Sequence, residues 1–147
     1  MTRLELIPAV EQDKHWLEQL RRAVYRDLFF ATWGGWDEAR HLRHSEGCWA
    51  QGSIQVVEVD GVRVGMLQLF ELPDAVEVGE IQIAPEHQNK GIGSRLLRDT
   101  IARAHGEGKK VVLSTGLQNR RAFQLYLRLG FRHAGRTDTL ELLECAP

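Results

Sequence analysis

Seven consecutive residues, Gln88-Asn-Lys-Gly91-Ile-Gly93-Ser94, combine two glycines with the expected start of a helix. The helix is indicated by apolar residues at near-helical spacing, namely Ile92, Leu96, Leu97, Ile101 and Ala104. The first backbone N–H groups of a helix have no partner within it and lie at the positive end of its dipole, so they attract anions. Because Gly91 and Gly93 lack a Cβ atom, a phosphate can approach the backbone closely. The segment therefore predicts a cradle for a pyrophosphate.

The spacing of this loop excludes two common phosphate-binding motifs. No Gly-Lys-Ser/Thr follows, as a Walker loop would require, and Leu96 occupies the position of the third glycine of a dinucleotide-binding fingerprint. The pattern that remains is Gln/Arg-x-x-Gly-x-Gly/Ala. An ordinary turn before a helix is the alternative interpretation of so short a motif, so the rest of the chain has to distinguish the two.

Two carboxylates, Glu77 and Glu80, precede the loop on a predicted strand over residues 76–84, which Pro85 ends. The apolar residues of this strand change parity halfway along it, from Val76 and Val78 to Ile81 and Ile83. A β-bulge near Gly79 would keep all four inside and place Glu77, Glu80 and Gln82 together on the opposite face. A strand that is buried on both faces is the alternative.

The other elements follow from periodicity and turn residues. Helices are predicted from about residue 10 to 31, over 37–44 with Asp37 as a plausible N-cap, and over 119–129 as a largely buried helix ended by Gly130. Strands are predicted over 2–8, 54–59, 62–70, 111–115, 131–135 and 139–143, and Asp60-Gly61 predicts a hairpin. The order β-α-α-β-β-β-α-β-α-β-β indicates an α/β or α+β sandwich, and residues 1–147 are expected to form a single domain.

Composition excludes several classes of protein. With 19 basic and 20 acidic residues the formal net charge is −1, which gives no support to nucleic-acid binding. No apolar run is long enough to span a bilayer and no signal peptide is evident, so no membrane partner and a cytoplasmic location are expected. Cys48 and Cys145 give no metal spacing, and His41-x-x-His44 has no evident third ligand, so no metal is predicted.

Two motifs together resemble a known family. The loop Gln88–Gly93 resembles the acetyl-CoA loop of the GNAT N-acetyltransferase superfamily. Further along, Asn119-x-x-Ala122-x-x-x-Tyr126-x-x-x-Gly130-Phe131 resembles the last helix of that family, whose Asn contacts the cofactor and whose Tyr faces the thiol. The resemblance covers residues 54–135 well and is looser before them. It implies a GNAT-like acyl-CoA N-acyltransferase fold, a mixed central sheet flanked by helices.

The resemblance also implies which residues bind acetyl-CoA. The backbone of Ile81, Gln82 and Ile83 would bond the pantetheine arm as an added strand would. Gln88 and Lys90 would flank the phosphates, and the pyrophosphate would be held by the N–H groups of Asn89, Lys90, Gly91, Ile92, Gly93 and Ser94. Asn119, Ala122 and Tyr126 would contact the cofactor from the last helix. Plainer roles remain open: a solvated lysine for Lys90, and helix caps for Ser94 and Asn119.

Transfer of an acetyl group to an amine requires a neutral amine, donors for the carbonyl oxygen and a protonated leaving thiolate. Glu77 and Glu80 are the candidate bases, and Tyr126 is the candidate acid because a phenol has a pKa of about 10. The backbone N–H of Ile81 is the candidate donor to the oxyanion. The alternatives are two surface carboxylates and a core tyrosine.

The sequence thus predicts an acetyl-CoA-dependent N-acetyltransferase that acts directly on the amine of a small molecule or a peptide. The alternative is a CoA-binding sensor or interaction module that has lost transfer. Trp33, Trp36 and Trp49 are candidates for lining an acceptor pocket or for filling a buried junction between helices. The acceptor is not identified, and a homodimer is left open.

Overall fold

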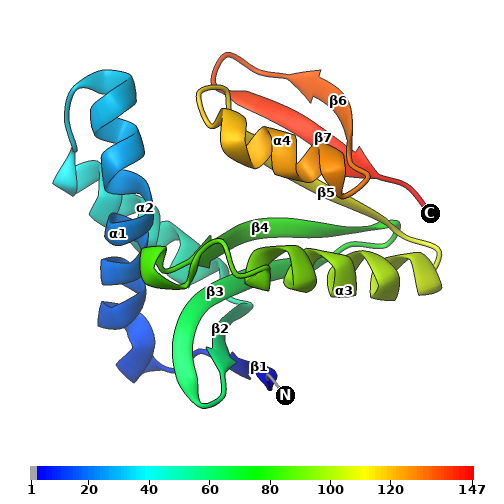
Figure 1. Ribbon diagram of the computed structural model, residues 1–147, viewed down its shortest axis with the longest axis horizontal. Helices are drawn as coiled ribbons and strands as arrows, with labels where there is room; N and C mark the ends of the chain where they lie inside the picture. Colours follow the sequence, from blue (N-terminus) through cyan, green and yellow to red (C-terminus); the bar gives the residue numbers. More distant parts are fainter. Residues whose placement is uncertain (1–2) are drawn as a thin grey trace. The chain divides into compact units, whose positions relative to one another are not determined.

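The computed structural model describes residues 3–147 and shows four α-helices and seven strands in that range (Figure 1). In chain order they are β1 Leu4–Pro8, α1 Lys14–Trp33, α2 Glu38–Gln51, β2 Ile54–Val59, β3 Val62–Glu71, β4 Ala75–Ile83, α3 Ile92–Gly106, β5 Lys110–Gly116, α4 Arg120–Arg128, β6 Arg132–Arg136 and β7 Leu140–Cys145. Single turns of 3-10 helix lie at Glu11–Asp13 and Pro85–His87. The predicted order of strands and α-helices is confirmed.

The strands form one mixed sheet in the order β1-β2-β3-β4-β5-β7-β6. Strands β4 and β5 are parallel, whereas β1 with β2, β2 with β3, β5 with β7 and β6 with β7 are antiparallel. In the part of the chain that is described, the ladder between β4 and β5 runs only from Ala75↔Lys110 to Glu77↔Val112. The later residues of β4 thus extend beyond this ladder.

The internal contacts divide the chain into two compact units. The first comprises residues up to 68 together with 80–90, and the second comprises 69–79 together with 91–147. The expectation that residues 1–147 form a single domain stays a prediction. No helix within residues 3–147 combines the length and apolarity that crossing a membrane would require.

The first unit packs α1 against the strands β2 and β3. Its core contains Leu20 from α1, Ile54 from β2, Met66 from β3 and Ala84, which follows β4. Half-buried side chains complete it, among them Trp16, Leu17 and Val24 of α1 and Cys48 and Trp49 of α2. Figure 1 shows α1 and α2 side by side in this unit. The helical spacing of the α1 residues explains why one stripe of this helix faces the strands.

The hairpin between β2 and β3 is confirmed. Asp60 and Gly61 both have positive φ, at 51° and 82°, as the turn type favoured in two-residue hairpins requires. The β2–β3 register shifts between Val57 and Glu58, an irregularity that the sequence pattern did not indicate. The bulge expected in β4 stays a prediction. The burial expected from it is not found, because Gln82 is buried whereas Ile81 and Ile83 are only half-buried.

Two helices of the first unit differ from their predicted bounds. Helix α1 begins at Lys14 rather than near residue 10, because a 3-10 turn precedes it. Helix α2 does not end at His44 but continues to Gln51, and its later turns bring Cys48 and Trp49 onto the core. Asp37 is the N-cap, as expected, since its side chain accepts from the backbone N–H of Arg40 at 3.0 Å.

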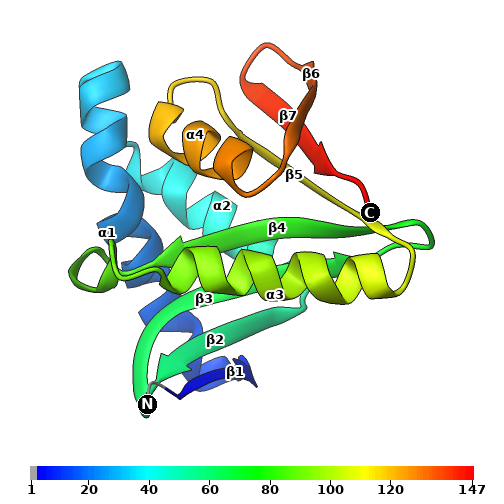
Figure 2. The same ribbon diagram turned by 45° about the vertical axis from the view of Figure 1, so that its right-hand side comes forward.

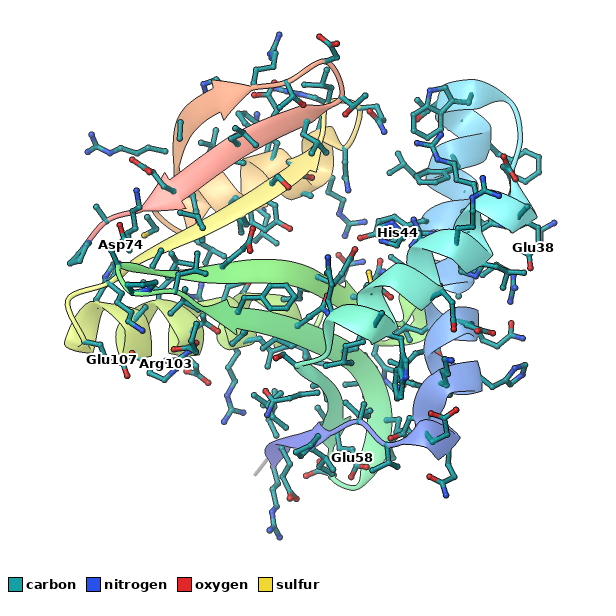
Figure 3. The ribbon with its side chains drawn as sticks, turned by 180° about the vertical axis from the view of Figure 1, so that it is seen from behind. Glu38, His44, Glu58, Asp74, Arg103 and Glu107 are labelled. Atoms are coloured by element: carbon teal, nitrogen blue, oxygen red, sulfur yellow. The ribbon has the colours of Figure 1, made fainter. Side chains whose placement is uncertain are left out.

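In the second unit α3 packs against β5 and α4 lies beside β5, with β6 at the edge of the sheet (Figure 2). Helix α3 buries one face that comprises Leu96, Leu97, Thr100 and Ala104. Helix α4 is less buried than predicted: only Tyr126 is fully buried, and Leu127 is 39% exposed. Gly130 has a φ of 102°, consistent with its predicted place after the helix end. Figure 3 shows Asp74, Arg103 and Glu107 at one end of this unit, where Arg103 pairs with both Glu71 and Glu107.

Candidate active site

The predicted phosphate loop ends at the first turn of α3. The N-cap residue is Gly91, which adopts a left-handed conformation with a φ of 79° and has no side chain to accept from the first N–H groups of the helix. The first turn contains no acidic residue, and a Cβ atom placed on Gly91 would meet no atom within 4 Å. The positive end of a 15-residue helix is therefore accessible beside Gly91. This geometry fits an anion such as a pyrophosphate.

Gln88 stabilises this loop from within. Its side-chain Nε2 donates to the backbone carbonyl of Ile83 at 2.9 Å, so it ties the loop to the end of β4. Lys90 and Asn89 are exposed, and Asn89 has a left-handed φ of 63°. The side chain of Gln88 thus has a structural role in shaping the loop, in addition to the predicted place of this residue beside the phosphates.

The end of β4 is held tightly against β3. The backbone N–H of Ala84 donates to the carbonyl of Val64 at 2.8 Å. A Cβ atom on Gly65 would lie 2.2 Å from the carbonyl oxygen of Gln82, so only glycine allows the two backbones to approach in this way. Residues Ile81–Ile83 therefore have a fixed backbone on the β3 side, and they lie past the last pair of the β4–β5 ladder.

Glu80 lies in a polar cluster, with its side chain 15% exposed. His44 Nε2 is 2.7 Å from one carboxylate oxygen, the thiol of Cys48 donates to that same oxygen at 3.7 Å, and Gln82 Nε2 donates to the other oxygen at 3.3 Å. Burial alone would raise the pKa of the Glu80 carboxyl. The hydrogen bonds from His44 and Gln82 and the charge of Arg21 outweigh burial, so the pKa lies below its ordinary value. The carboxylate is ionised at neutral pH.

The same surroundings shift the pKa of the neighbouring Cys48 thiol upward. Burial, followed by the negative charge of Glu80 and the hydrogen bond to it, raises the pKa of the Cys48 thiol to about 12. The thiol therefore carries its proton at neutral pH and acts as a donor to Glu80. Figure 3 shows His44 on α2, four residues before Cys48 on the same helix.

A second polar contact in the first unit joins Arg21 of α1 to His41 of α2. Arg21 Nη1 is 2.9 Å from His41 Nδ1, and His41 is only 2% exposed. Burial and the charge of Arg21 lower the pKa of His41, so its neutral ring accepts from Arg21 through Nδ1. Within residues 3–147, neither Nε2 of His41 nor Nε of Arg21 has a hydrogen-bond partner in the protein. Three rings surround the guanidinium, at Tyr25, Phe29 and Trp36.

Sequence reasoning missed Arg21. The signal that could have found it is its position, four residues after Leu17 and three before Val24, which places a charge inside the apolar stripe of α1. A charge at such a position is rarely buried unless it has a partner. Here the partners are His41 and, through its charge, Glu80.

A small cavity adjoins the cluster, with a volume of about 30 Å³. Among its lining residues are Arg21, Ser45, Cys48, Trp49, Met66 and Gln82. Of the three tryptophans proposed to line an acceptor pocket, only Trp49 borders this cavity. Trp36 packs against Phe29 and His41 instead, and Trp33 is 60% exposed.

The two candidate bases lie in different environments. Glu77 is exposed and belongs to the second unit, where it pairs with Val112 in the β4–β5 ladder. Glu80 belongs to the first unit and has the polar neighbours described above. The two candidate bases therefore differ in burial and in their polar neighbours.

The residues predicted on the last helix lie at its start and on its inner face. Asn119 is the N-cap of α4, since its side chain accepts from the backbone N–H of Ala122 at 3.3 Å. Tyr126 is 8% exposed, and its ring meets that of Phe131 edge to face at 5.8 Å. The capping role of Asn119 is confirmed. The cofactor contacts of Asn119, Ala122 and Tyr126 stay predictions.

Known proteins resemble this chain in sequence and in fold. An uncharacterised N-acetyltransferase of Methanocaldococcus jannaschii is 27% identical over 123 residues, which cover 73% of this chain and 54% of that protein. A spermidine N(1)-acetyltransferase of Escherichia coli is 33% identical over 86 residues, covering 54% of this chain and 45% of that protein. The chain thus spans about half the length of the curated relatives it matches.

The fold matches solved structures along its whole length. The PaiA N-acetyltransferase of Thermoplasma acidophilum, solved in complex with coenzyme A, superposes with a TM-score of 0.75 at 17% identity, covering 99% of each chain. The family model described as acetyltransferase (GNAT) family matches residues 11–131. This match includes both motifs quoted from the sequence, the loop and all of α4. The chain belongs to the acetyltransferase (GNAT) family.

Proposed function

We propose that this protein transfers an acetyl group from acetyl-CoA directly to the amine of a small molecule or a peptide. The observation that carries the proposal is the start of α3, where a glycine N-cap leaves the positive end of the helix accessible. Family membership supports acetyl-CoA as the ligand of that anion site, bound through its pyrophosphate. The solved relative in complex with coenzyme A supports the same ligand.

The proposed cofactor contacts follow the chain. The backbone of Ile81, Gln82 and Ile83 bonds the pantetheine arm, past the point where the β4–β5 ladder ends. The N–H groups from Asn89 to Ser94 hold the pyrophosphate, with Gln88 fixing the loop and Lys90 adding positive charge. Asn119 and Ala122 contact the cofactor from the first turn of α4. Acetyl-CoA supplies the activated thioester in this reaction.

Glu80 is the proposed base. A lysine-like amine with a pKa of about 10.4 costs roughly 4–5 kcal/mol to deprotonate at pH 7. The proposed base accepts the proton that the nitrogen loses as the C–N bond forms, when that nitrogen is far more acidic than the free ammonium. Glu80 is ionised and mostly buried, and a cavity adjoins its cluster, whereas Glu77 is exposed. These differences favour Glu80, directly or through a water molecule.

Ile81 and Tyr126 are proposed to assist the two bond changes of the transfer. The amine nitrogen attacks the thioester carbon, and the backbone N–H of Ile81 donates to the oxygen that becomes negative. When the C–N bond has formed, the C–S bond breaks and the Tyr126 hydroxyl gives its proton to the departing thiolate. The products are the acetylated amine and free coenzyme A.

A second function is a CoA-binding sensor that no longer transfers acetyl groups. An ionised carboxylate at Glu80 and a tyrosine at 126 favour catalysis, because a sensor needs neither. Incubation with acetyl-CoA and a panel of polyamines, amino acids and peptides tests the difference, read as free thiol released. Acceptor-dependent release supports the transferase. Protection of the fold by coenzyme A without release from any acceptor would support the sensor.

The proposed acceptor is the amine of a small molecule or of a peptide. One relative acts on spermidine by its name, which makes polyamines a first group for the panel. The formal charge of −1 gives no reason to include nucleic acids.

A further inference from the structure

Three donor atoms of different kinds meet beside the proposed base. His44 Nε2, Cys48 Sγ and a carboxylate oxygen of Glu80 all lie within 4.8 Å of one another, the one group of this kind among residues 3–147. We propose that this cluster binds a zinc ion, and that a bound zinc ion blocks acetyl transfer by occupying Glu80. The binding itself stands apart from the proposed function, whereas the inhibition rests on it.

The placement of the three side chains suits a metal. His44 and Cys48 are four residues apart on α2, so they lie on the same face of that helix one turn from each other. Glu80 comes from β4 in the same compact unit and reaches both of them. Imidazole, thiolate and carboxylate are the three ligand types that zinc takes in proteins.

The distances from Glu80 to the other two donor atoms are close to those of a tetrahedral site. Zinc–ligand bonds of about 2.0–2.3 Å place a thiolate sulfur and a carboxylate oxygen about 3.6 Å apart, and an imidazole nitrogen and an oxygen about 3.4 Å apart. The Cys48–Glu80 distance is 3.7 Å, and the His44–Glu80 distance is 2.7 Å. Zinc therefore requires His44 to withdraw by less than about 1 Å. Its side chain is 42% exposed, which leaves room for that movement.

Charge and space are also adequate. Binding removes the proton of Cys48, so the ion with one thiolate, one carboxylate and a neutral imidazole forms a site with no net charge. The nearby guanidinium of Arg21 then faces a neutral complex rather than a second cation. The adjoining cavity of about 30 Å³ borders Cys48, and a water molecule needs about 10–15 Å³ on this measure. A water can therefore complete the coordination.

The proposed site leaves no local sequence pattern, because its ligands come from distant segments. His44 and Cys48 lie 36 and 32 residues before Glu80. The predicted end of the second helix at His44 also separated the histidine from the cysteine. Once α2 continues to Gln51, the two residues share a helical face.

The experiment uses cobalt(II) as a spectroscopic probe for zinc. Cobalt bound to a thiolate gives a charge-transfer band in the near ultraviolet, and a tetrahedral site gives strong visible bands. The protein is titrated with cobalt and then with zinc, which should displace it. The matched control is the other free cysteine, Cys145, which lies on β7 in the second unit.

We expect the thiolate band in the parent and in Cys145→Ala, and its loss in Cys48→Ser. Zinc affinity should fall at least about tenfold in Cys48→Ser and in His44→Asn, while the exposed His15→Asn keeps the parent value. Circular dichroism confirms that each variant is folded. A parent without the band, or a band that persists in folded Cys48→Ser, overturns the site.

A separate experiment tests whether zinc inhibits acetyl transfer. In the acetyl-transfer assay zinc should inhibit the parent, and the zinc concentration for half inhibition should rise at least about tenfold in Cys48→Ser. An unchanged value would overturn the inhibition while leaving the spectroscopic result to decide the site. A parent that transfers no acetyl group would contradict the proposed function, and the cobalt spectrum would still test zinc binding.

Discussion

Burial of Glu80 disfavours the ionised form of its carboxyl group, whereas the neighbouring side chains favour that form. Hydrogen bonds from His44 and Gln82 and the charge of Arg21 keep its pKa below the ordinary value. The proposed base is ionised throughout the neutral range, because its pKa lies below that of an ordinary glutamate carboxyl. The rise of the rate above neutral pH should therefore follow the deprotonation of the acceptor amine.

The first prediction concerns this carboxylate. Glu80→Gln should lower kcat by roughly 10²–10⁴, the usual effect of losing a positioned base, because the amide cannot accept the proton. The rate of the variant should still rise with the ionisation of the amine. Glu77→Gln is the matched control, since it makes the same change on the same strand at an exposed position. Steady-state kinetics over a pH series measure both. Equal losses in the two variants would contradict a specific role for Glu80.

The second prediction concerns the hydroxyl of Tyr126. Tyr126→Phe keeps the ring and its edge-to-face contact with Phe131, and it removes the proposed acid. The rate should fall by roughly 10²–10⁴ in kcat and in kcat/KM alike, the pattern of an interaction made only in the transition state. Affinity for coenzyme A should hardly change. A rate within about twofold of the parent would assign Tyr126 to the core alone.

Helix α3 carries the third prediction. At 100 times its Kd, coenzyme A should stabilise the parent by about 2.7 kcal/mol, measured as a rise in Tm. Gly91→Val should abolish this stabilisation, because the side chain enters the space beside the N-cap and the φ of 79° disfavours valine. Gly106→Ala, at the other end of the same helix, is the control and should respond as the parent does. Full stabilisation of a folded Gly91→Val protein would disprove the loop assignment.

At the scale of elements, the sequence predicted what local patterns determine. The order of strands and α-helices, the Asp60-Gly61 turn and the Asp37 cap all follow from periodicity, turn preferences and capping, which act over a few residues. The length of α2 does not. Gly47 and the polar residues around it weaken the local helical signal, and the helix continues because Cys48 and Trp49 gain burial against Leu20 and its neighbours.

The candidate site, like the fold, was predictable only where it depends on local sequence patterns. The glycine loop and the Asn119 cap are sequence motifs, so they could be found directly. The cluster around Glu80 depends on which side chains α1 and α2 bring to β4, and no local pattern reports that. Arg21 and His41 were therefore missed as a pair, and the difference in burial between Glu77 and Glu80 could not be predicted.

At the scale of the whole molecule, buried titratable groups link stability to pH. His41 is neutral in the fold, and burial with the nearby Arg21 charge holds its pKa below the ordinary value of 6.5. In the unfolded chain the same ring takes up a proton as the pH falls through about 6.5. The unfolded state then binds more protons than the folded state, so stability decreases as the pH falls. Carboxyl groups whose pKa is lowered in the fold, Glu80 among them, reduce stability at lower pH still, below about pH 4.3, where the unfolded chain begins to protonate them.

The last prediction follows from this linkage. Between about pH 6.5 and 5, the free energy of unfolding should fall with a slope of at most about 1.4 kcal/mol per pH unit from His41. In His41→Gln this slope should shrink, because glutamine does not titrate and its side-chain oxygen can accept from Arg21 where the imidazole did. Urea unfolding at a series of pH values measures the slope, with His15→Gln on the exposed face of α1 as the control. The loss below about pH 4.3 should persist in both variants, since the carboxyl groups that cause it are unchanged. A slope between pH 6.5 and 5 that is the same in His41→Gln as in the parent would show that another group accounts for the acid sensitivity of the fold.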